Sequence, residues 1–162
     1  MSVTAGVPRE MREAAEDLMG EYAELIDADR LEDWLELFTE DAVYEVLPRE
    51  NEEQRLPAAL MLCTNKNMIR DRVVSLRNAN EYNLHYDRHL VGRVRVAPHT
   101  EGVWRLEASY AVYQTNLEGQ TRMFSVGRYR DKARMDAGRL RFCEKKVIVD
   151  TYSVPTLLAT PL

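Results

Sequence analysis

The sequence predicts an α+β fold in which helices come first and a mainly antiparallel sheet follows. Two periodicities support this prediction. Apart from one short strand, apolar residues recur at three- and four-residue spacing in the first half of the chain, whereas they alternate with polar residues through the second half. Turn signals that contain glycine or proline separate the alternating segments. Helices segregated from a run of long strands are typical of α+β domains.

The first helix is expected over about residues 9–28. Pro8 precedes it, and proline suits the first turn of a helix because an N–H would lack a partner there. Glutamate, arginine and aspartate fill most positions between the apolar ones. The apolar residues, which share one face of this amphipathic helix, are Met11, Ala14, Ala15, Leu18, Tyr22, Leu25 and Ile26.

Two further helices are expected. Asp29 could cap the second helix, with Glu32 as its reciprocal partner three residues later, and this helix should end near Thr39. Its buried stripe comprises Leu31, Trp34, Leu35 and Phe38. The third helix is expected over about residues 65–79. Its buried stripe comprises Ile69, Val73 and Leu76.

A strand is expected between the second and third helices, over residues 42–47. One of its faces carries Ala42, Tyr44 and Val46. Pro48 should end the strand, because proline cannot donate to a ladder of hydrogen bonds. The polar residues 49–57 are then expected to form a surface loop.

Four alternating segments predict the strands of the second half, at residues 89–96, 104–112, 121–134 and 139–151. In the first, Leu90, Val94 and Val96 oppose Arg93 and Arg95. In the second, one face carries Trp104, Leu106, Ala108, Tyr110 and Val112. Turns are expected between Pro98 and Gly102, at Glu118–Gly119 and at Asp136–Gly138.

A strongly curved sheet wrapped around the long first helix would form a cone with an apolar interior. Residues 1–162 are long enough to bury one core, and no boundary suggests a second domain. The tail, residues 153–162, is apolar but contains two prolines. It is expected to be extended and docked, with a neighbouring subunit as one place where it could dock.

The net charge of −5 conceals an uneven distribution. Residues 1–53 carry 17 acidic and 4 basic side chains, whereas residues 120–162 carry 4 acidic and 9 basic ones. The two ends of the chain could form separate solvated faces, or complementary faces of neighbouring subunits. Nucleic-acid binding is not expected, because the balance is acidic and the basic residues follow the alternation of strands.

The location is expected to be cytoplasmic. No apolar run is long enough to span a bilayer, and the first residues contain no apolar core of a signal peptide. Cys63 and Cys143 are far apart and belong to no CxxC pair, so both should be reduced thiols. Neither has the sequence context of a nucleophile, and no glycine-rich phosphate loop is present.

The histidines offer only a weak metal motif. His85 and His89 could face the same side of a strand or helix, and Glu81 or Asp87 could be proposed as a third ligand. The spacing is not specific, so structural or surface histidines are the preferred interpretation. The pattern of cysteines and histidines also fails to fit an iron–sulfur centre. We therefore expect no metal and no cofactor in this chain.

One catalytic possibility remains, in a pocket between the first helix and the sheet. The polar-tipped residues that could reach such a pocket are Tyr22, Tyr44, His89, Tyr110 and Tyr113. A tyrosine–histidine pair could perform acid–base chemistry on a small enolisable substrate. The preferred interpretation is that these residues belong to the core and that their hydroxyls find hydrogen-bond partners there.

Several segments together resemble a known family. Tyr22 and Asp27 precede WLELFTEDAVYEVLPRE at residues 34–50, and DRVVSLR (71–77) and DRHLVGRVRV (87–96) follow before the long strands. In order and spacing, the chain resembles the small (β) subunit of Rieske non-haem iron aromatic-ring-hydroxylating dioxygenases. The first segment is also similar to the wider nuclear-transport-factor-like superfamily of cone-shaped domains.

The resemblance implies a curved-sheet cone and a role in assembly. Such β subunits associate with a larger α subunit, commonly as a hexamer of three α and three β subunits with the β subunits in a trimer. The α subunit carries the Rieske 2Fe–2S cluster and the mononuclear Fe(II), and receives electrons from NAD(P)H through a reductase. No catalytic residue of the family is therefore expected in this chain.

The segment from Leu47 to Val73 resembles the branch that oxidises aromatic carboxylates such as anthranilate, benzoate or salicylate. The whole enzyme would add both atoms of O2 to an aromatic ring. Two alternatives remain open at the level of sequence. One is a stand-alone cone-fold lyase or isomerase with a tyrosine–histidine pocket, and the other is a domain that binds a small ligand without catalysis.

Overall fold

The computed structural model describes residues 6–56, 59–79, 85–151 and 161–162. Its helices are α1 (Arg9–Asp27), α2 (Leu31–Trp34), α3 (Arg49–Gln54) and α4 (Lys66–Ala79), and a 3-10 turn, η1 (Leu35–Leu37), follows α2. Its strands are β1 (Phe38–Pro48), β2 (Met61–Cys63), β3 (His85–Val91), β4 (Arg95–Thr100), β5 (Val103–Asn116), β6 (Thr121–Asp136) and β7 (Arg139–Val149). Helices packed on a mainly antiparallel sheet confirm the predicted α+β class.

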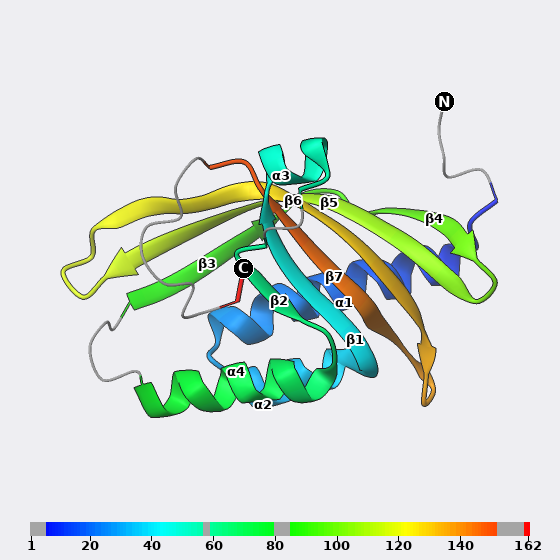
Figure 1. Cartoon of the computed structure of the whole chain (residues 1–162), viewed down its shortest axis with the longest axis horizontal. Coiled ribbons are helices and arrows are strands. Elements are labelled where there is room, and N and C mark those ends of the chain that lie inside the picture. The colour runs from blue at the N-terminus through cyan, green and yellow to red at the C-terminus, as the bar shows by residue number, and fades with distance from the viewer. Residues whose placement is uncertain (1–5, 57–58, 80–84, 152–160) are drawn as a thin grey trace.

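The strands form one seven-stranded sheet in the order β2-β1-β7-β6-β5-β3, and β4 also pairs with β5. All pairs are antiparallel except β1 with β7. The long strands β5, β6 and β7 curve over α1, while α2 and α4 lie farther below and α3 lies on the opposite side (Figure 1). The sheet and helices therefore enclose a cone, as predicted.

Gly127 permits the close approach of two strands in this curved sheet. It lies on β6, with Tyr110 of β5 on one side and Val149 of β7 on the other. A Cβ atom at this position would lie 2.0 Å from the carbonyl oxygen of Ile148, far inside contact distance. A glycine in a strand interior marks such approaches. The inner face of the sheet can then wrap tightly around α1.

The predicted apolar stripes of α1 and α4 are confirmed. Arg9–Asp27 closely matches the predicted 9–28, and Ala15, Leu18, Tyr22, Leu25 and Ile26 are buried. Helix α4 likewise buries its predicted stripe of Ile69, Val73 and Leu76. On β5 the predicted inward residues from Leu106 to Val112 are buried as well. These elements have one polar and one apolar face, so periodicity identifies them.

The predicted course of the second helix is wrong at both ends. Asp29 does not cap it, because this residue has a left-handed backbone (φ 57°) and its carboxylate pairs with Arg77. Helix α2 ends at Trp34, and Phe38 belongs to β1, where it pairs with Phe142 of β7. Most residues from Leu31 to Phe38 are buried, so the apolar pattern could not locate the change from helix to strand.

Residues 49–54 form the short helix α3 instead of the predicted loop. Pro48 stands at its N-terminal boundary with an extended backbone, and an Arg49–Glu53 pair at i,i+4 spacing joins successive turns. The three-residue strand β2 was not predicted. It pairs with β1 through Tyr44, Glu45 and Val46.

The predicted strand 89–96 is two strands, β3 and β4, with a break at residues 92–94. Gly92 donates its N–H to the carbonyl of Ser109 at the break. The predicted common face of Leu90 and Val96 is wrong, since Leu90 is 55% exposed and Val96 is buried. Pro98 lies inside β4 instead of in the turn. The remaining turns at 118–119 and 136–138 are confirmed.

Candidate functional site in the interior of the cone

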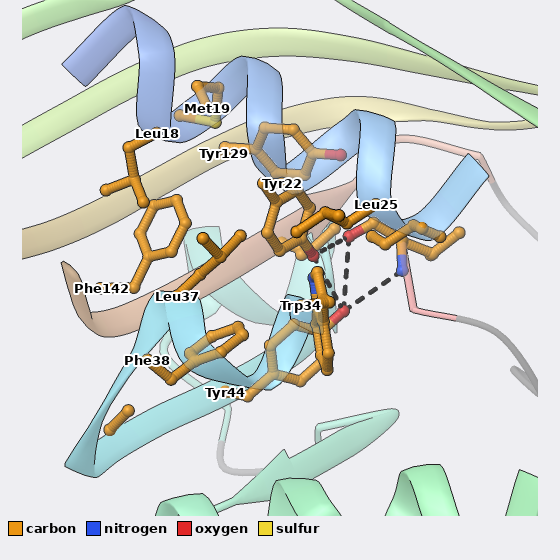
Figure 2. Close-up of a cluster of buried hydrophobic side chains, with 14 of the residues drawn as sticks. Leu18, Met19, Tyr22, Leu25, Trp34, Leu37, Phe38, Tyr44, Tyr129 and Phe142 are labelled. Carbon is orange, nitrogen blue, oxygen red and sulfur yellow. Dashed lines mark hydrogen bonds between the residues drawn. The ribbon is translucent and has the colours of Figure 1, made fainter. Parts of the chain in front are cut away.

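Tyr22 of α1 and Tyr44 of β1 meet inside the cone and hold the backbone of Leu162 (Figure 2). Both tyrosine hydroxyls contact the Leu162 carbonyl, with 3.3 Å for Tyr44, and the Leu162 N–H donates to the Tyr44 hydroxyl at 3.2 Å. The two hydroxyls lie 3.4 Å apart. Leu162 thus docks within its own chain. The prediction that the tail is docked also concerns residues 153–160, which lie outside the described residues.

Aromatic side chains surround Tyr22. Its ring centroid lies 5.6 to 5.8 Å from those of Trp34, Tyr129 and Phe142. Burial away from water raises the pKa of Tyr22 well above its ordinary value, and burial also raises the pKa of Tyr44. Both phenols therefore stay protonated and serve as hydrogen-bonding groups in a packed core, as the preferred interpretation of the tyrosines proposed.

An ion pair lies beside this aromatic cluster. Lys145 of β7 donates to Asp131 of β6 at 2.8 Å, and neither side chain is exposed. The Lys145 Nζ lies 3.5 Å from the ring centroid of Tyr129 and 4.1 Å from that of Tyr22. A cation over aromatic rings gains electrostatic attraction when it is desolvated. The pair therefore joins two strands and α1 through the interior of the cone.

Asp131, Lys145 and Tyr129 were not among the site residues predicted from the sequence. The alternation of the strands does place these residues on the inner face. On β6, Tyr129 and Asp131 alternate in step with the buried Ala133. On β7, Lys145 alternates in step with the buried Val147. Charged residues at inward positions of two neighbouring strands could have predicted a buried pair.

His89 of β3 is anchored by Asp27, the last residue of α1. The His89 backbone N–H donates to one carboxylate oxygen at 2.9 Å, and the ring Nδ1 lies 2.6 Å from the other. The His89 side chain is fully buried, and its Nε2 has no hydrogen-bond partner within the described part of the chain. The contact fastens the end of α1 to β3.

The remaining candidate tyrosines do not complete a catalytic arrangement. Tyr110 bonds to Ser125 at 2.9 Å and stacks on Tyr129 with 4.5 Å between ring centroids, and burial raises its pKa. Tyr113 lies beyond the register shift between β5 and β6, opposite Met123, and is only partly buried. Tyr22, Tyr44 and Tyr110 thus belong to the core, but Tyr113 does not join them.

The possible metal ligands are placed separately. His85 lies 3.4 Å from Asp87 on the same strand, whereas His89 is engaged by Asp27. Burial raises the pKa of Asp87. Glu81 lies outside the described residues. Among residues 6–56, 59–79, 85–151 and 161–162, no three or more histidine, cysteine, aspartate or glutamate side chains are grouped to hold a metal.

The two cysteines are free thiols on different strands. Cys63 is buried on β2, Cys143 is partly buried on β7, and burial raises the pKa of each. A raised pKa disfavours the thiolate, which is the nucleophilic form. These cysteines have the environment of structural residues.

A small cavity lies between β1, β2, α2 and α4. Its free volume of about 20 Å³ has room for about one water molecule. Its lining, which is mostly apolar, includes Trp34, Tyr44, Cys63, Ile69 and Pro161. An aromatic substrate is far larger than this cavity.

Acidic residues of the first part of the chain pair with basic residues of the later strands and helix α4. Arg134 binds Asp41, Arg139 binds Glu21, and Arg130 binds Glu52, each with an N–O distance of 2.6 or 2.7 Å. The uneven distribution of charge along the sequence is therefore partly neutralised inside one chain. Neither separate solvated faces nor contacts between subunits account for these pairs.

The fold and its interior together define a cone-shaped domain of the nuclear-transport-factor-like class. Within that class the chain belongs to one family, described as the ring-hydroxylating beta subunit, whose model matches residues 21–156. This match confirms the family predicted from the sequence. Members of the family are subunits of multisubunit oxidoreductases. The stand-alone lyase or isomerase and the simple ligand-binding domain are not favoured.

Two relatives and one solved structure illustrate the similarity. The chain is 43% identical to the anthranilate 1,2-dioxygenase small subunit of Burkholderia cepacia, over 90% of each chain. It is 32% identical to the beta 2 subunit of the terephthalate 1,2-dioxygenase terminal oxygenase component of Comamonas sp., covering 87% of this chain and 92% of the relative. A structure from Novosphingobium aromaticivorans, assigned as the beta subunit of an aromatic-ring-hydroxylating dioxygenase, matches with a TM-score of 0.87 and 41% identity, over 95% of this chain and 98% of that one.

No helix in the described part of the chain combines the length and apolar composition needed to cross a membrane.

Proposed function

We propose that this chain is the non-catalytic β subunit of an aromatic-ring-hydroxylating dioxygenase and that it supports assembly with a larger α subunit. The family match over residues 21–156 is the observation that carries this proposal. The packed interior supports the non-catalytic part, because the candidate residues Tyr22, Tyr44, Tyr110 and His89 are buried among structural partners. We propose that all four are structural.

The α subunit would supply the chemistry. It would hold a Rieske 2Fe–2S cluster and a mononuclear Fe(II), and would receive electrons from NAD(P)H through a reductase. In the described part of this chain, no three or more histidine, cysteine, aspartate or glutamate side chains are grouped to hold a metal, which is compatible with a division of labour between the subunits. The β subunit would then act by positioning α subunits in the assembly.

The substrate would be an aromatic ring that carries a carboxylate, to which the complete enzyme adds both atoms of O2. The names of two relatives, an anthranilate and a terephthalate dioxygenase, support this substrate class. The assembly would contain three α and three β subunits, with the β subunits in a trimer. We further propose that residues 1–162 form a single domain and that the enzyme is cytoplasmic, without nucleic-acid or membrane partners.

Co-expression with a Rieske-type α subunit tests this proposal. Native mass measurement of the purified material should give a complex with equal numbers of the two chains. A chain that never co-purifies with such a partner, while the partner is fully active alone, would overturn the proposal.

A further inference from the structure

The outer face of the sheet has two parts that differ in character. Over β4 to β7 it carries a ladder of ion pairs, in which Glu107 lies 3.7 Å from Arg105 and 3.8 Å from Arg130. Lys132 and Glu144 continue the ladder across β6 and β7 at 2.7 Å. The charges of this ladder have partners within the chain, so the surface that it covers is an ordinary solvated one.

The other part, at the free edge of β3, is apolar at its centre. Tyr86, Leu90 and Met123 are 67%, 55% and 53% exposed. Arg88 of β3 and Met123 of β6 both lie opposite Tyr113 of β5, and residues opposite one another in a ladder share a face. Exposed apolar groups clustered in this way mark interaction surfaces.

Two arginines belong to the same surface as these apolar residues, one among them and one beside them. Arg88 lies between Tyr86 and Leu90 on β3, and Arg128 lies on the same outer face of β6, opposite Ser109. Both are exposed, and neither has an ion-pair partner within the described ranges. We call Tyr86, Arg88, Leu90, Met123 and Arg128 the β3–β6 patch. An apolar centre with charged groups around it is the usual anatomy of a protein interface.

The same chain carries a complementary surface on α1. Glu10, Asp17 and Glu24 recur at seven-residue spacing on the side of the helix opposite its buried stripe. All three are exposed and lack ion-pair partners among the described residues, whereas Glu13 between them pairs with Arg9. We call Glu10, Asp17 and Glu24 the α1 stripe.

One chain cannot bring these two surfaces together. Helix α1 lies on the inner side of the sheet (Figure 1), where Asp27 holds His89. The β3 residues of the β3–β6 patch alternate with His89 along the strand and therefore lie on its outer side. The β3–β6 patch of one copy can therefore contact an α1 stripe only if that stripe belongs to another copy. Such a head-to-tail contact is heterologous, and repeated copies close into a ring when the rotation allows it.

We propose that the β3–β6 patch of one copy docks against the α1 stripe of a second copy of this chain. The proposal deepens the proposed function, because it names the surfaces through which β subunits would contact one another. Opposite potentials at the two surfaces would steer the encounter and fix its orientation. The contact should also weaken as salt screens the charges.

Charge reversal in the full-length chain tests the proposal. Native mass and sedimentation of the wild type should give multiples of 18.8 kDa, both alone and within a complex with the α subunit. The Arg88→Glu/Arg128→Glu variant should self-associate about tenfold more weakly, and so should Asp17→Lys/Glu24→Lys. Combining all four substitutions reverses both surfaces and should restore self-association. The matched control, Arg70→Glu/Glu101→Lys, alters exposed charges elsewhere and should have no effect.

Two results would overturn the proposal. One is a wild-type chain that stays monomeric alone and occurs once per complex. The other is a four-substitution variant that fails to regain association, since the two surfaces would then not face each other. Binding of the α subunit is measured separately by co-purification. Loss of that binding with intact self-association would count against the proposed function alone.

Discussion

Lys145 and Asp131 form an ion pair in the interior of the cone, with 2.8 Å between Nζ and Oδ2 and no exposure of either side chain. Burial opposes the charged form of both groups, raising the pKa of Asp131 to about 6 and lowering that of Lys145 to about 8. Each charge is therefore tolerated in the core chiefly because the opposite charge beside it compensates for the loss of water.

Replacing Lys145 alone should be strongly destabilising. Lys145→Met leaves the Asp131 carboxylate buried without its cation, at an expected cost of about 3–5 kcal/mol in the free energy of unfolding near pH 7. The control Asp131→Leu/Lys145→Met removes both charges and should recover most of that loss. Urea unfolding of the three proteins gives the comparison.

The Lys145→Met variant should also gain stability in acid relative to wild type. Without the lysine, the pKa of Asp131 in the folded state rises further above its unfolded value of about 3.9. The folded variant then binds more protons than the unfolded chain, so its stability increases as the pH falls through the folded pKa. A deficit equal at pH 8 and pH 5 would contradict this account.

Gly127→Ala should disrupt the curved sheet. The added Cβ would lie 2.0 Å from the Ile148 carbonyl oxygen, and neither backbone can yield without breaking the ladder. We expect a loss of about 3 kcal/mol, the upper end of the range for overpacking. Gly20→Ala is a matched control, because Gly20 lies inside α1 with no atom within 4 Å of the new Cβ. It should stabilise by about 0.5–1 kcal/mol, and thermal unfolding separates the two.

Arg77 fastens α4 to the turn between α1 and α2. Its guanidinium donates to Asp29 at 2.7 Å and to Glu32 at 2.9 Å, and the hydrogen bonds from Arg77 lower the pKa of Glu32 to about 2. Solvent screens these largely exposed carboxylates, so Arg77→Ala should cost no more than about 1 kcal/mol.

The pH dependence of this contribution has a definite sign. A depressed carboxyl pKa stabilises the fold above the unfolded value of about 4.3, and the stabilisation is lost as the pH falls toward 2. The difference between wild type and Arg77→Ala should therefore shrink over that window. Arg70→Ala, which removes a bond to Asn67 on the same helix, should show no such pH dependence.

His89→Ala separates the structural role from the catalytic alternative. The substitution leaves the Asp27 carboxylate without its imidazole partner, and the free energy of unfolding should fall by about 1–3 kcal/mol. Dioxygenase turnover per assembled complex should equal that of the wild type. A Tyr44→Phe variant should behave in the same way. Loss of turnover in complexes of unchanged mass would instead give these residues a part in the chemistry.

The sequence was sufficient for elements whose two faces differ. Helices α1 and α4 and strand β5 each combine a buried and a solvated side, so their periodicity predicts them closely. The sequence was insufficient to locate the change from helix to strand between Trp34 and Phe38, because a run of buried residues fits both the helical and the strand periodicity. It also failed at Leu90, because the break after Val91 places this residue on the outer face.

The candidate site was predictable only in part. Tyr22, Tyr44 and Tyr110 are inward-facing, as the sequence pattern indicates, but their partners depend on contacts between distant segments. The Leu162 backbone meets Tyr44 across 118 residues, and His89 meets Asp27 across 62. No local pattern encodes such contacts. Likewise, no local pattern in the acidic first part of the chain indicates that Asp41 and Glu21 pair with β6 and β7.

The division of labour between the two subunits is tested by measuring turnover of an aromatic carboxylate such as anthranilate, together with native mass, for three samples. They are this chain alone, its α subunit alone, and the two co-expressed. We expect no turnover by the isolated chain, and turnover by a complex that contains equal numbers of both chains. Turnover by the isolated chain, or a fully active α subunit that never binds it, would rule out the proposed role as a non-catalytic β subunit.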